Sequence, residues 1–305
     1  MSVHPVRDRR AVRVAGLVSV GVGVAVLALK SLAAWRTASL TLFSDALESV
    51  VNVVAAAIAA AAIHYGARPA DDDHPFGHSK VEYFSAGIEG GLVVLAAVTI
   101  AFQAVHRFGS EPRLPELGLG LAVSGLATGL NLALALWLGK VGRRHTSPAL
   151  EADALHVRSD VWTSVGAYVG FGIAWATRRW ELDALIAMAV AVHILFAGLR
   201  AMKSSVGGLM DQGLPREQCE AIDAVVGREG PPVVEHHDLR TRRAGPDLFV
   251  EFHLVVTGRT TVQASHEVCD RLEAAIRELH PGAHVTIHVE PEQEARLVPP
   301  PDGGL

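Results

Sequence analysis

Residues 40–64 read LTLFSDALESVVNVVAAAIAAAAIH, a stretch in which nearly every side chain is apolar. A helix needs about 20 mostly apolar residues to cross the hydrocarbon core of a bilayer, so this stretch predicts a membrane-spanning helix. Asp45, Glu48 and Asn52 interrupt it at spacings of three and four, which place them on one helix face. Charged groups inside a membrane are costly and usually functional, so the stretch also predicts a site.

Working outward from this stretch, the first two-thirds of the chain are strongly apolar. The 305 residues are 50% hydrophobic and 19% charged, with a mean hydropathy of +0.29, whereas a soluble domain is about a quarter charged. Six segments are candidate spans: 12–32, 40–64, 84–108, 117–138, 154–176 and 182–199. The basic N-terminus before the first span is also a feature of signal peptides, but no clear cleavage motif follows, which favours an uncleaved first span.

Charge predicts the orientation of these spans. An even number of spans places both termini on one side, where the segments hold eleven Lys and Arg residues against five in the opposite segments. Because Lys and Arg favour the cytoplasmic side, we expect both termini, and the loop between the second and third spans, to be cytoplasmic.

From Asp211 the chain has the character of a soluble domain. Alternating and helical periods predict the order α-β-β-α-β, an α+β domain; the elements fall within 214–229, 233–245, 246–256, 260–282 and 283–291. We therefore expect a transmembrane domain over 1–209, a cytoplasmic domain over 210–292 and a disordered tail over 293–305. Cys219 and Cys269 form neither a disulfide framework nor a CxxC site, which favours free thiols in a reducing compartment. The net charge of -5 suggests no nucleic-acid partner.

The fifth span carries a second polar face. Asp153, His156 and Asp160 repeat the three-then-four spacing of the second span. Two ligands from each of two facing helices would form a four-coordinate site of the kind that zinc and its neighbours prefer. The alternative is that these side chains join helices by hydrogen bonds or line a water-filled cavity.

Four motifs in this order resemble the cation diffusion facilitator family, and within it the bacterial iron/zinc efflux type. They are SDALESVVN (44–52), RPADDDHPFGHSKVEYFSAGIEG (68–90), LHVRSDVWTS (155–164) and HDLRTRRAGPDLFVEFHL (237–254). The resemblance covers nearly the whole chain. It implies a homodimeric, multi-pass protein of the bacterial inner membrane that exports a divalent cation (zinc, iron, manganese, cobalt or cadmium) in exchange for protons.

The resemblance also implies where the metal binds. The transport site falls on four residues: Glu48, Asn52, His156 and Asp160. Relatives usually have Asp or His at position 48 and Asp at position 52, so this chain has one charge fewer and a harder oxygen ligand. Asp45 could supply the missing charge.

Two further metal sites and an ion pair follow from the same resemblance. The loop site falls on Asp71, His74 and His78; the alternative for this segment is a solvated acidic loop with HPFG as a turn. In the cytoplasmic domain the matching residues are His237, His253, His288 and Glu290, with His236 as an additional candidate. Relatives often have Asp at position 290. An ion pair is expected between Lys80 and Asp211.

The motifs leave three classes of function to compare. A proton-coupled exporter fits both polar faces, and the chain has no GxxxxGK[ST] motif for nucleotide-driven transport. A membrane metallo-hydrolase would use the same ligand types, but no HExxH motif or nucleophile motif occurs, so we expect no enzyme. A metal sensor that does not transport would not need polar faces inside two spans. His156 is the natural proton carrier, because an imidazole titrates near neutrality and binds metal only when neutral.

Overall fold

A computed structural model describes residues 9–37, 40–106, 108 and 119–295. Within the helices, the side chains of residues 37, 40–42, 44, 45 and 119–121 lie outside this description. The chain divides into two compact units, one over 8–209 and one from Met210 onward. Each unit is described by itself below.

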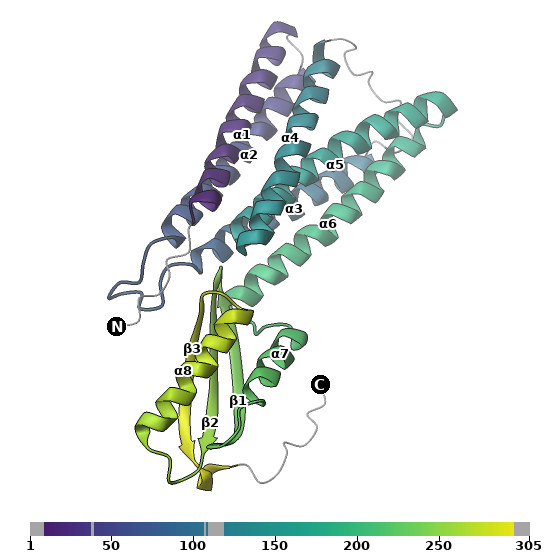
Figure 1. Cartoon of the computed structure of the whole chain (residues 1–305). Helices are drawn as coiled ribbons and strands as arrows, with labels where there is room; N and C mark the ends of the chain where they lie inside the picture. The colour runs from purple at the N-terminus through teal and green to yellow at the C-terminus, as the bar shows by residue number, and fades with distance from the viewer. Residues whose placement is uncertain (1–8, 38–39, 107, 109–118, 296–305) are drawn as a thin grey trace. The chain divides into compact units, whose positions relative to one another are not determined.

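The first unit consists of six long helices in its described residues (Figure 1). They are α1 (Arg10–Thr37), α2 (Leu40–Gly66), α3 (Val81–His106), α4 (Leu119–His145), α5 (Pro148–Thr177) and α6 (Glu181–Leu209). Among the described residues, five of them (all but α5) are long and apolar enough to cross a membrane. Helix α5 has 30 residues but carries charged groups in its first half, including Asp153 and Asp160. The predicted six-helix architecture is confirmed.

The predicted bounds of several helices were too short. Helix α5 begins at Pro148 instead of residue 154, because the side chain of Ser147 caps its first turn by accepting a hydrogen bond from the Leu150 N–H at 3.4 Å. Helix α6 continues past residue 199 to Leu209. A search for apolar runs finds only the part of a helix that lies in hydrocarbon, so polar turns at helix ends are missed.

The helices pack in two groups within this unit. Helices α1, α2, α4 and α5 share a core that includes Ala15, Ile63, Leu138 and Leu150. Helix α3 packs closely along α6, and the two are seen together in Figure 1. A Cβ atom added to Gly198 would lie 2.9 Å from the nearest side-chain carbon of α3. Small residues therefore let the two backbones approach, as is common in membrane helices.

A buried carboxylate joins four of these helices at one end of the unit. Glu82, in the first turn of α3, is 1% exposed. It accepts a hydrogen bond from Ser147, the cap of α5, and pairs with Arg9 at 3.4 Å, just before α1. Arg9 also donates to the carbonyl of Gly66 at the end of α2 at 2.7 Å and to Ser79 Oγ at 2.9 Å. A buried charge needs such partners, so this network fixes the helix ends relative to one another.

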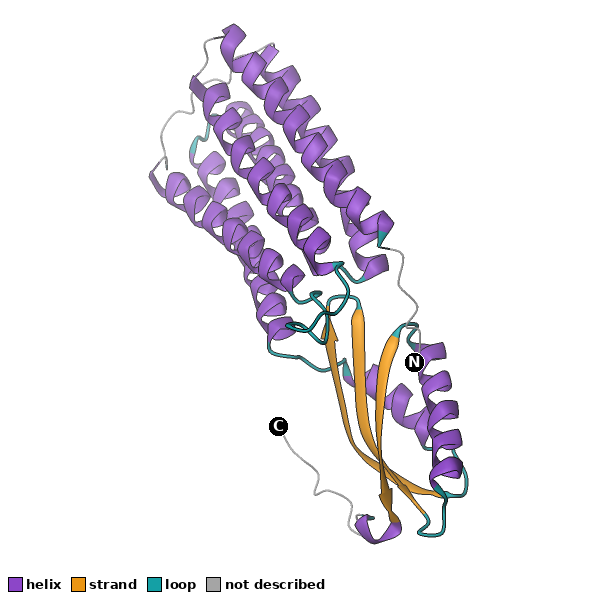
Figure 2. Ribbon diagram, turned by 90° about the vertical axis from the view of Figure 1, so that its left-hand side faces the viewer, coloured by secondary structure: helices purple, strands orange, loops and turns teal. Residues whose placement is uncertain are grey.

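The second unit is an α+β domain with the predicted order. It comprises α7 (Arg216–Val226), β1 (Val233–Ala244), β2 (Asp247–Val256), α8 (Val262–Leu279), β3 (Ala283–Pro291) and a short 3-10 turn, η1 (Glu292–Glu294). The strand order is β1-β2-β3, with β1 antiparallel and β3 parallel to β2 (Figure 2). Alternate residues of β2, such as Phe252 and Leu254, pack with Ile222 of α7 and Leu272 of α8. The helices thus cover one face of the sheet.

A β-bulge changes which residues of β1 face the helices. His237 pairs with His253, but the next pair is Arg240 with Glu251, so two residues of β1 oppose one of β2. Asp238, inside this bulge, has φ of 54°, a left-handed conformation that Asp tolerates better than most residues. A bulge of this kind shifts the alternation of side chains by one position.

Part of the segment expected to be a disordered tail, residues 293–295, is described by the structure. Glu292 and Glu294 belong to η1, which lies near the end of β2, with the Glu292 carboxylate 3.6 Å from a Cβ built on Gly258. Residues 296–305 lie outside the described residues, and the prediction for them stays a prediction.

Candidate metal sites

The polar faces of α2 and α5 meet inside the helical unit. The Asn52 side-chain amide donates to Asp160 Oδ2 at 2.6 Å, and its carbonyl oxygen lies 3.0 Å from His156 Nε2. Because a carboxylate only accepts, the amide NH2 faces Asp160 and the carbonyl is left for the imidazole N–H. The structure thus brings together three of the four predicted transport ligands. A cation at this point would meet all three oxygen and nitrogen donors once the amide turns its carbonyl toward it.

The fourth predicted ligand lies at the edge of this cluster. Glu48 is one turn before Asn52 on α2 and is exposed, yet its charge acts on the His156 imidazole. The side chain of Asp45 lies outside the described residues, so its proposed contribution stays a prediction. A small cavity of about 20 Å³ adjoins Asn52 and Asp160 and is also lined by Asn131 of α4.

Two buried carboxylates lie close to this cluster, and only one of them was noticed in the sequence. Asp153 of α5 and Glu89 of α3 are 1% and 0% exposed and interact electrostatically with each other. Ser85 donates to one Glu89 oxygen at 3.3 Å, while the other oxygen of Glu89 and one of Asp153 have no hydrogen-bond partner among the described residues. The signal for Glu89 was present in the sequence, because Glu82, Ser85 and Glu89 repeat the three-then-four spacing of the other polar faces.

The loop between α2 and α3 brings its three predicted ligands together. His78 Nε2 lies 3.3 Å from Asp71 Oδ2, and His74 Nδ1 lies 3.2 Å from Asp71 Oδ1. One potential ligand atom of each residue lies within 4.8 Å of the others. The His78 ring is buried and bonds the Pro69 carbonyl through Nδ1 at 3.1 Å, which leaves Nε2 aimed at the cluster.

Electrostatics favour an ionised carboxylate in this loop. Desolvation raises the pKa of the Asp71 carboxyl, but hydrogen bonds from the His74 backbone and ring, together with the nearby His78, outweigh it and hold the pKa below its ordinary value. Asp71 therefore offers a charged oxygen ligand at neutral pH. A merely solvated acidic loop would not need a buried histidine facing the carboxylate.

In the second unit the predicted ligands form a row across the sheet. His237, His253 and His288 are register partners on β1, β2 and β3. Glu290 reaches two of them, with its Oε1 2.8 Å from His253 Nδ1 and its Oε2 3.3 Å from His237 Nε2. The row lies on the face opposite the helices, because Phe252 and Leu254, the neighbours of His253, point into the core.

The outer members of this set differ in their environments. His288 is largely exposed, and its Nε2 lies 3.7 Å from Glu290 Oε1, so it stands at the open end of the row. His236 faces the opposite side of the sheet and contacts Asp223 of α7 at 3.2 Å. The structure therefore groups His237, His253 and Glu290 most tightly and does not support the suggestion that His236 takes part.

The predicted ion pair joins residues of the two units and stays a prediction. Within its own unit, Asp211 contacts Arg242 at 3.4 Å.

Comparisons with known proteins place this geometry in a family. Residues 16–210 match the family of the cation efflux transmembrane domain, and residues 214–292 match the cytoplasmic domain of cation efflux proteins. An uncharacterized transporter of Synechocystis sp. is 42% identical over 96% of this chain and 94% of its own. The cation-efflux pump FieF of Salmonella agona is 31% identical over 92% of this chain and 93% of its own.

Two solved structures that are similar to the chain each cover about a quarter of it. The CzrB transporter in a Zn form is 50% identical over 28% of this chain and 98% of its own, with a TM-score of 0.25. The metal-bound C-terminal domain of the CzcD transporter from Thermotoga maritima is 30% identical over 27% of this chain and 100% of its own, also with a TM-score of 0.25.

The helical unit with a polar cluster between its helices, joined to a small α+β domain, defines a multi-pass membrane transporter. The chain belongs to the cation efflux family, which the sequence motifs had indicated.

Proposed function

We propose that the chain is a homodimeric antiporter that exports a divalent transition-metal cation from the cytoplasm in exchange for protons. The observation that supports this most directly is the cluster of Asn52, His156 and Asp160 inside α2 and α5. With Glu48 at its edge, the cluster offers two carboxylates, one imidazole and one amide. The two negative charges match those of a divalent cation, so a bound ion would be neutralised in a low-dielectric setting.

The ligand set bears on which cation is carried. Imidazole suits zinc and its neighbours, whereas carboxylate and carbonyl oxygens suit harder ions such as manganese. Asn52 exchanges a carboxylate of the usual family pattern for a neutral oxygen. The transport assay therefore includes all five candidate metals: zinc, iron, manganese, cobalt and cadmium.

Protons would compete with the metal at this cluster. Metal binds only the neutral imidazole of His156, with Asp160 and Glu48 as further proton acceptors. Apparent metal affinity should therefore fall as the pH drops from about 7.5 to about 6, through the range in which histidine titrates. Protonation from the outer side would then expel the metal, and metal from the cytoplasm would expel the protons.

The remaining clusters would hold structural ions. In the cytoplasmic domain, His237, His253 and Glu290 would bind the ion, with His288 closing the open end of the row. The fit is supported by Glu290 Oε2, which is buried and lies 3.3 Å from His237 Nε2 but accepts no hydrogen bond among the described residues. The row lies on the sheet face that α7 and α8 leave open, so a second copy of the domain could cover it. Asp71, His74 and His78 would bind an ion in the loop.

The proposed orientation places both termini in the cytoplasm of a bacterial cell, with the chain in the inner membrane. Helix α6 leads directly into the domain that matches a cytoplasmic family domain, and six spans return the N-terminus to the same side. The curated relatives named above are bacterial.

Two alternatives use the same residues. A membrane metallo-hydrolase would require a general base beside a metal with an open position, and a sensor without transport would bind metal but carry no flux. Neither alternative explains why the candidate ligands face one another within two helices of membrane-spanning length.

Proteoliposomes provide the test. Purified protein would be reconstituted with a trapped pH dye and challenged with each of the five metals, and metal uptake and proton release would be measured together. We expect metal flux with counter-movement of protons, and loss of both in His156→Ala and Asp160→Ala with the dimer intact. Wild-type flux in both variants would refute the site, and flux without proton movement at an affinity flat with pH would refute antiport. Metal binding with no flux at all would favour a sensor.

A further inference from the structure

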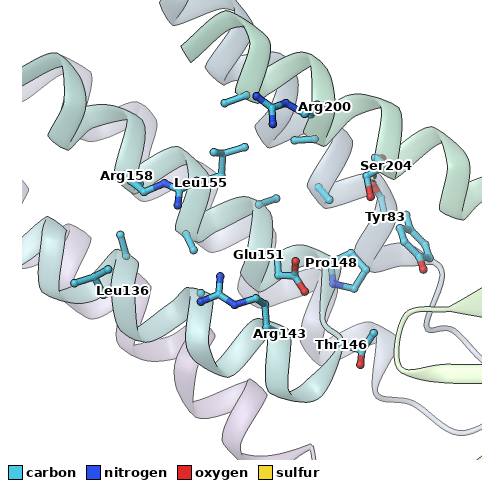
Figure 3. A pocket seen from close by; sticks show the side chains of 18 of the residues that line it. Tyr83, Leu136, Arg143, Thr146, Pro148, Glu151, Leu155, Arg158, Arg200 and Ser204 are labelled. Atoms are coloured by element: carbon cyan, nitrogen blue, oxygen red, sulfur yellow. Dashed lines mark hydrogen bonds between the residues drawn. The ribbon is translucent and has the colours of Figure 1, made fainter. Parts of the chain in front are cut away.

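A cavity of about 570 Å³ opens between helices of the first unit, apart from the metal clusters (Figure 3). Residues of α3, α4, α5 and α6 line it. Its walls are largely apolar, with Leu136 of α4 and Leu155 of α5 among them. Three of the residues that line the cavity are basic: Arg143 of α4, Arg158 of α5 and Arg200 of α6.

The positive charges in this cavity are only partly compensated. Arg143 lies beside Glu151 in Figure 3 and interacts with its carboxylate. Arg158 forms no hydrogen bond or ion pair with any described residue. In the described part of the chain, Arg200 donates only to the Phe196 carbonyl of its own helix, at 3.3 Å. Among the described lining residues, three guanidinium groups thus face one carboxylate.

The position of these arginines along their helices indicates their depth. Arg158 is ten residues from the start of α5 and Arg200 nine residues from the end of α6, that is about 15 Å and about 14 Å at a rise of 1.5 Å per residue. Each helix, at about 45 Å, exceeds the hydrocarbon core of about 30 Å by roughly 7 Å at each end. Both side chains are therefore within snorkelling reach of the headgroup layer on the side that continues into the cytoplasmic domain.

This charge pattern disfavours the cavity as a path for the metal. A dication would be repelled by the three guanidinium groups, of which only Arg143 has a carboxylate partner among the lining residues. An anion, in contrast, would find fork-shaped donors that match phosphate oxygens, with apolar walls beside them. Basic pockets between membrane helices on the cytoplasmic side are suited to anionic headgroups.

We propose that this cavity binds the phosphate of an anionic phospholipid, held by Arg158 and Arg200 with Arg143 at its rim, and with an acyl chain along the apolar wall. The shared chemistry is that of a phosphate, which either a lipid or free phosphate could supply. The proposal does not depend on the transport mechanism, because it concerns a separate surface and a separate ligand.

The test uses the full-length protein in detergent micelles. Thermal melting would be followed on titration with phosphatidylglycerol, with phosphatidylcholine and with inorganic phosphate. The variant is Arg158→Gln/Arg200→Gln. The matched control is Arg144→Gln/Lys203→Gln, which removes the same charge from exposed positions at the same ends of α4 and α6 that do not line the cavity. Native mass spectrometry would count retained lipids.

We expect phosphatidylglycerol to stabilise the wild type and the control at concentrations at least tenfold lower than phosphatidylcholine does, and the variant to lose this preference. Equal loss in the control would show a diffuse surface effect and overturn the site. Equal stabilisation by inorganic phosphate would overturn the assignment to lipid. If the variant does not fold, Arg158→Lys/Arg200→Lys keeps the charges but removes the forks, and should weaken the preference at least threefold; an unchanged preference there would also overturn the proposal.

Discussion

Replacing Asn52 with aspartate is the sharpest test of the cluster between α2 and α5. In the structure the Asn52 amide donates to Asp160 Oδ2 at 2.6 Å. Asn52→Asp removes this donor and places a second carboxylate against the first. Without metal, the two can remain close only by sharing a proton or moving apart; with metal, both become ligands.

The geometry sets the size of the effect. Loss of a hydrogen bond to a charged acceptor costs about 1.5–3 kcal/mol. Two charges about 4 Å apart repel by about 4 kcal/mol at an effective dielectric constant of 20. We expect the metal-free variant to be less stable than the metal-free wild type by about 3 kcal/mol. This value lies between the cost of the lost hydrogen bond and that of the full charge repulsion, because the side chains can relax. Since bound metal removes this penalty, zinc affinity should rise by about a hundredfold.

The assay is a competition titration of full-length protein in detergent at pH 7.5, with zinc and manganese against a metal-chelating dye. Zinc affinity should rise more than manganese affinity, because the added carboxylate completes a set that already contains imidazole. Thermal melting with and without zinc should show a larger metal-induced shift in the variant, by roughly 5 to 10 °C.

The matched control is Asn131→Asp, which adds the same charge from α4 at the edge of the same small cavity. An equal gain in both variants would show that negative charge alone attracts the metal. Unchanged relative affinities in Asn52→Asp would show that Asn52 is not a ligand, and would refute the reasoning.

Three further predictions concern packing, dimerisation and thiol reactivity. Gly208→Ala should destabilise the helical unit by about 1–3 kcal/mol, because a Cβ there would lie 2.2 Å from an aromatic ring of α3, whereas Gly172→Ala, with nothing within 4 Å, should leave the melting temperature nearly unchanged; equal melting temperatures would contradict the packing. In the fragment from Asp211 onward, zinc should lower the dimer dissociation constant measured by analytical ultracentrifugation, since an ion that binds only the dimer favours it by mass action, and His253→Ala should abolish the effect; equal constants with zinc and with chelator would count against an interfacial ion. Burial raises the pKa of the Cys269 thiol, and nearby carboxylates raise it further, so less reactive thiolate is present at pH 7.5 and alkylation should label Cys219 first; faster labelling of Cys269 in the folded protein would contradict this environment.

The sequence was sufficient to predict the helices and the α+β domain, because an apolar run of membrane length and an alternating strand are both local patterns. The ends of the helices were not predictable from apolarity alone. The start of α5 nevertheless had a local signal, since Ser147 followed by Pro148 is a typical helix N-terminus. The burial of Glu82 depends on partners before α1, at the end of α2 and at the cap of α5, so nothing close to it in the sequence indicated it.

The site residues also divide into those that a local sequence pattern indicates and those that only the fold brings together. The spacing of Asn52, His156 and Asp160 predicted two helix faces, but only the fold shows that the faces meet. Glu89 has the same spacing signal on a third span, but its burial beside Asp153 depends on how α3 and α5 pack. The ligands on the sheet came from family resemblance, since a lone histidine on a strand carries little information about metal.

The bulge in β1 would influence which kind of metal the proposed site on the sheet prefers. In a regular strand paired through Arg240 and Glu251, the residue opposite His253 would be Asp238, and His237 would point toward the helices. The single extra residue therefore decides whether an oxygen or a nitrogen atom completes the row. A substitution that straightened β1 would exchange a borderline nitrogen donor, His237, for a hard oxygen donor, Asp238, and the preference should then move from zinc toward harder ions such as manganese. Ligand identity at this position is thus encoded in backbone conformation as well as in the side chains.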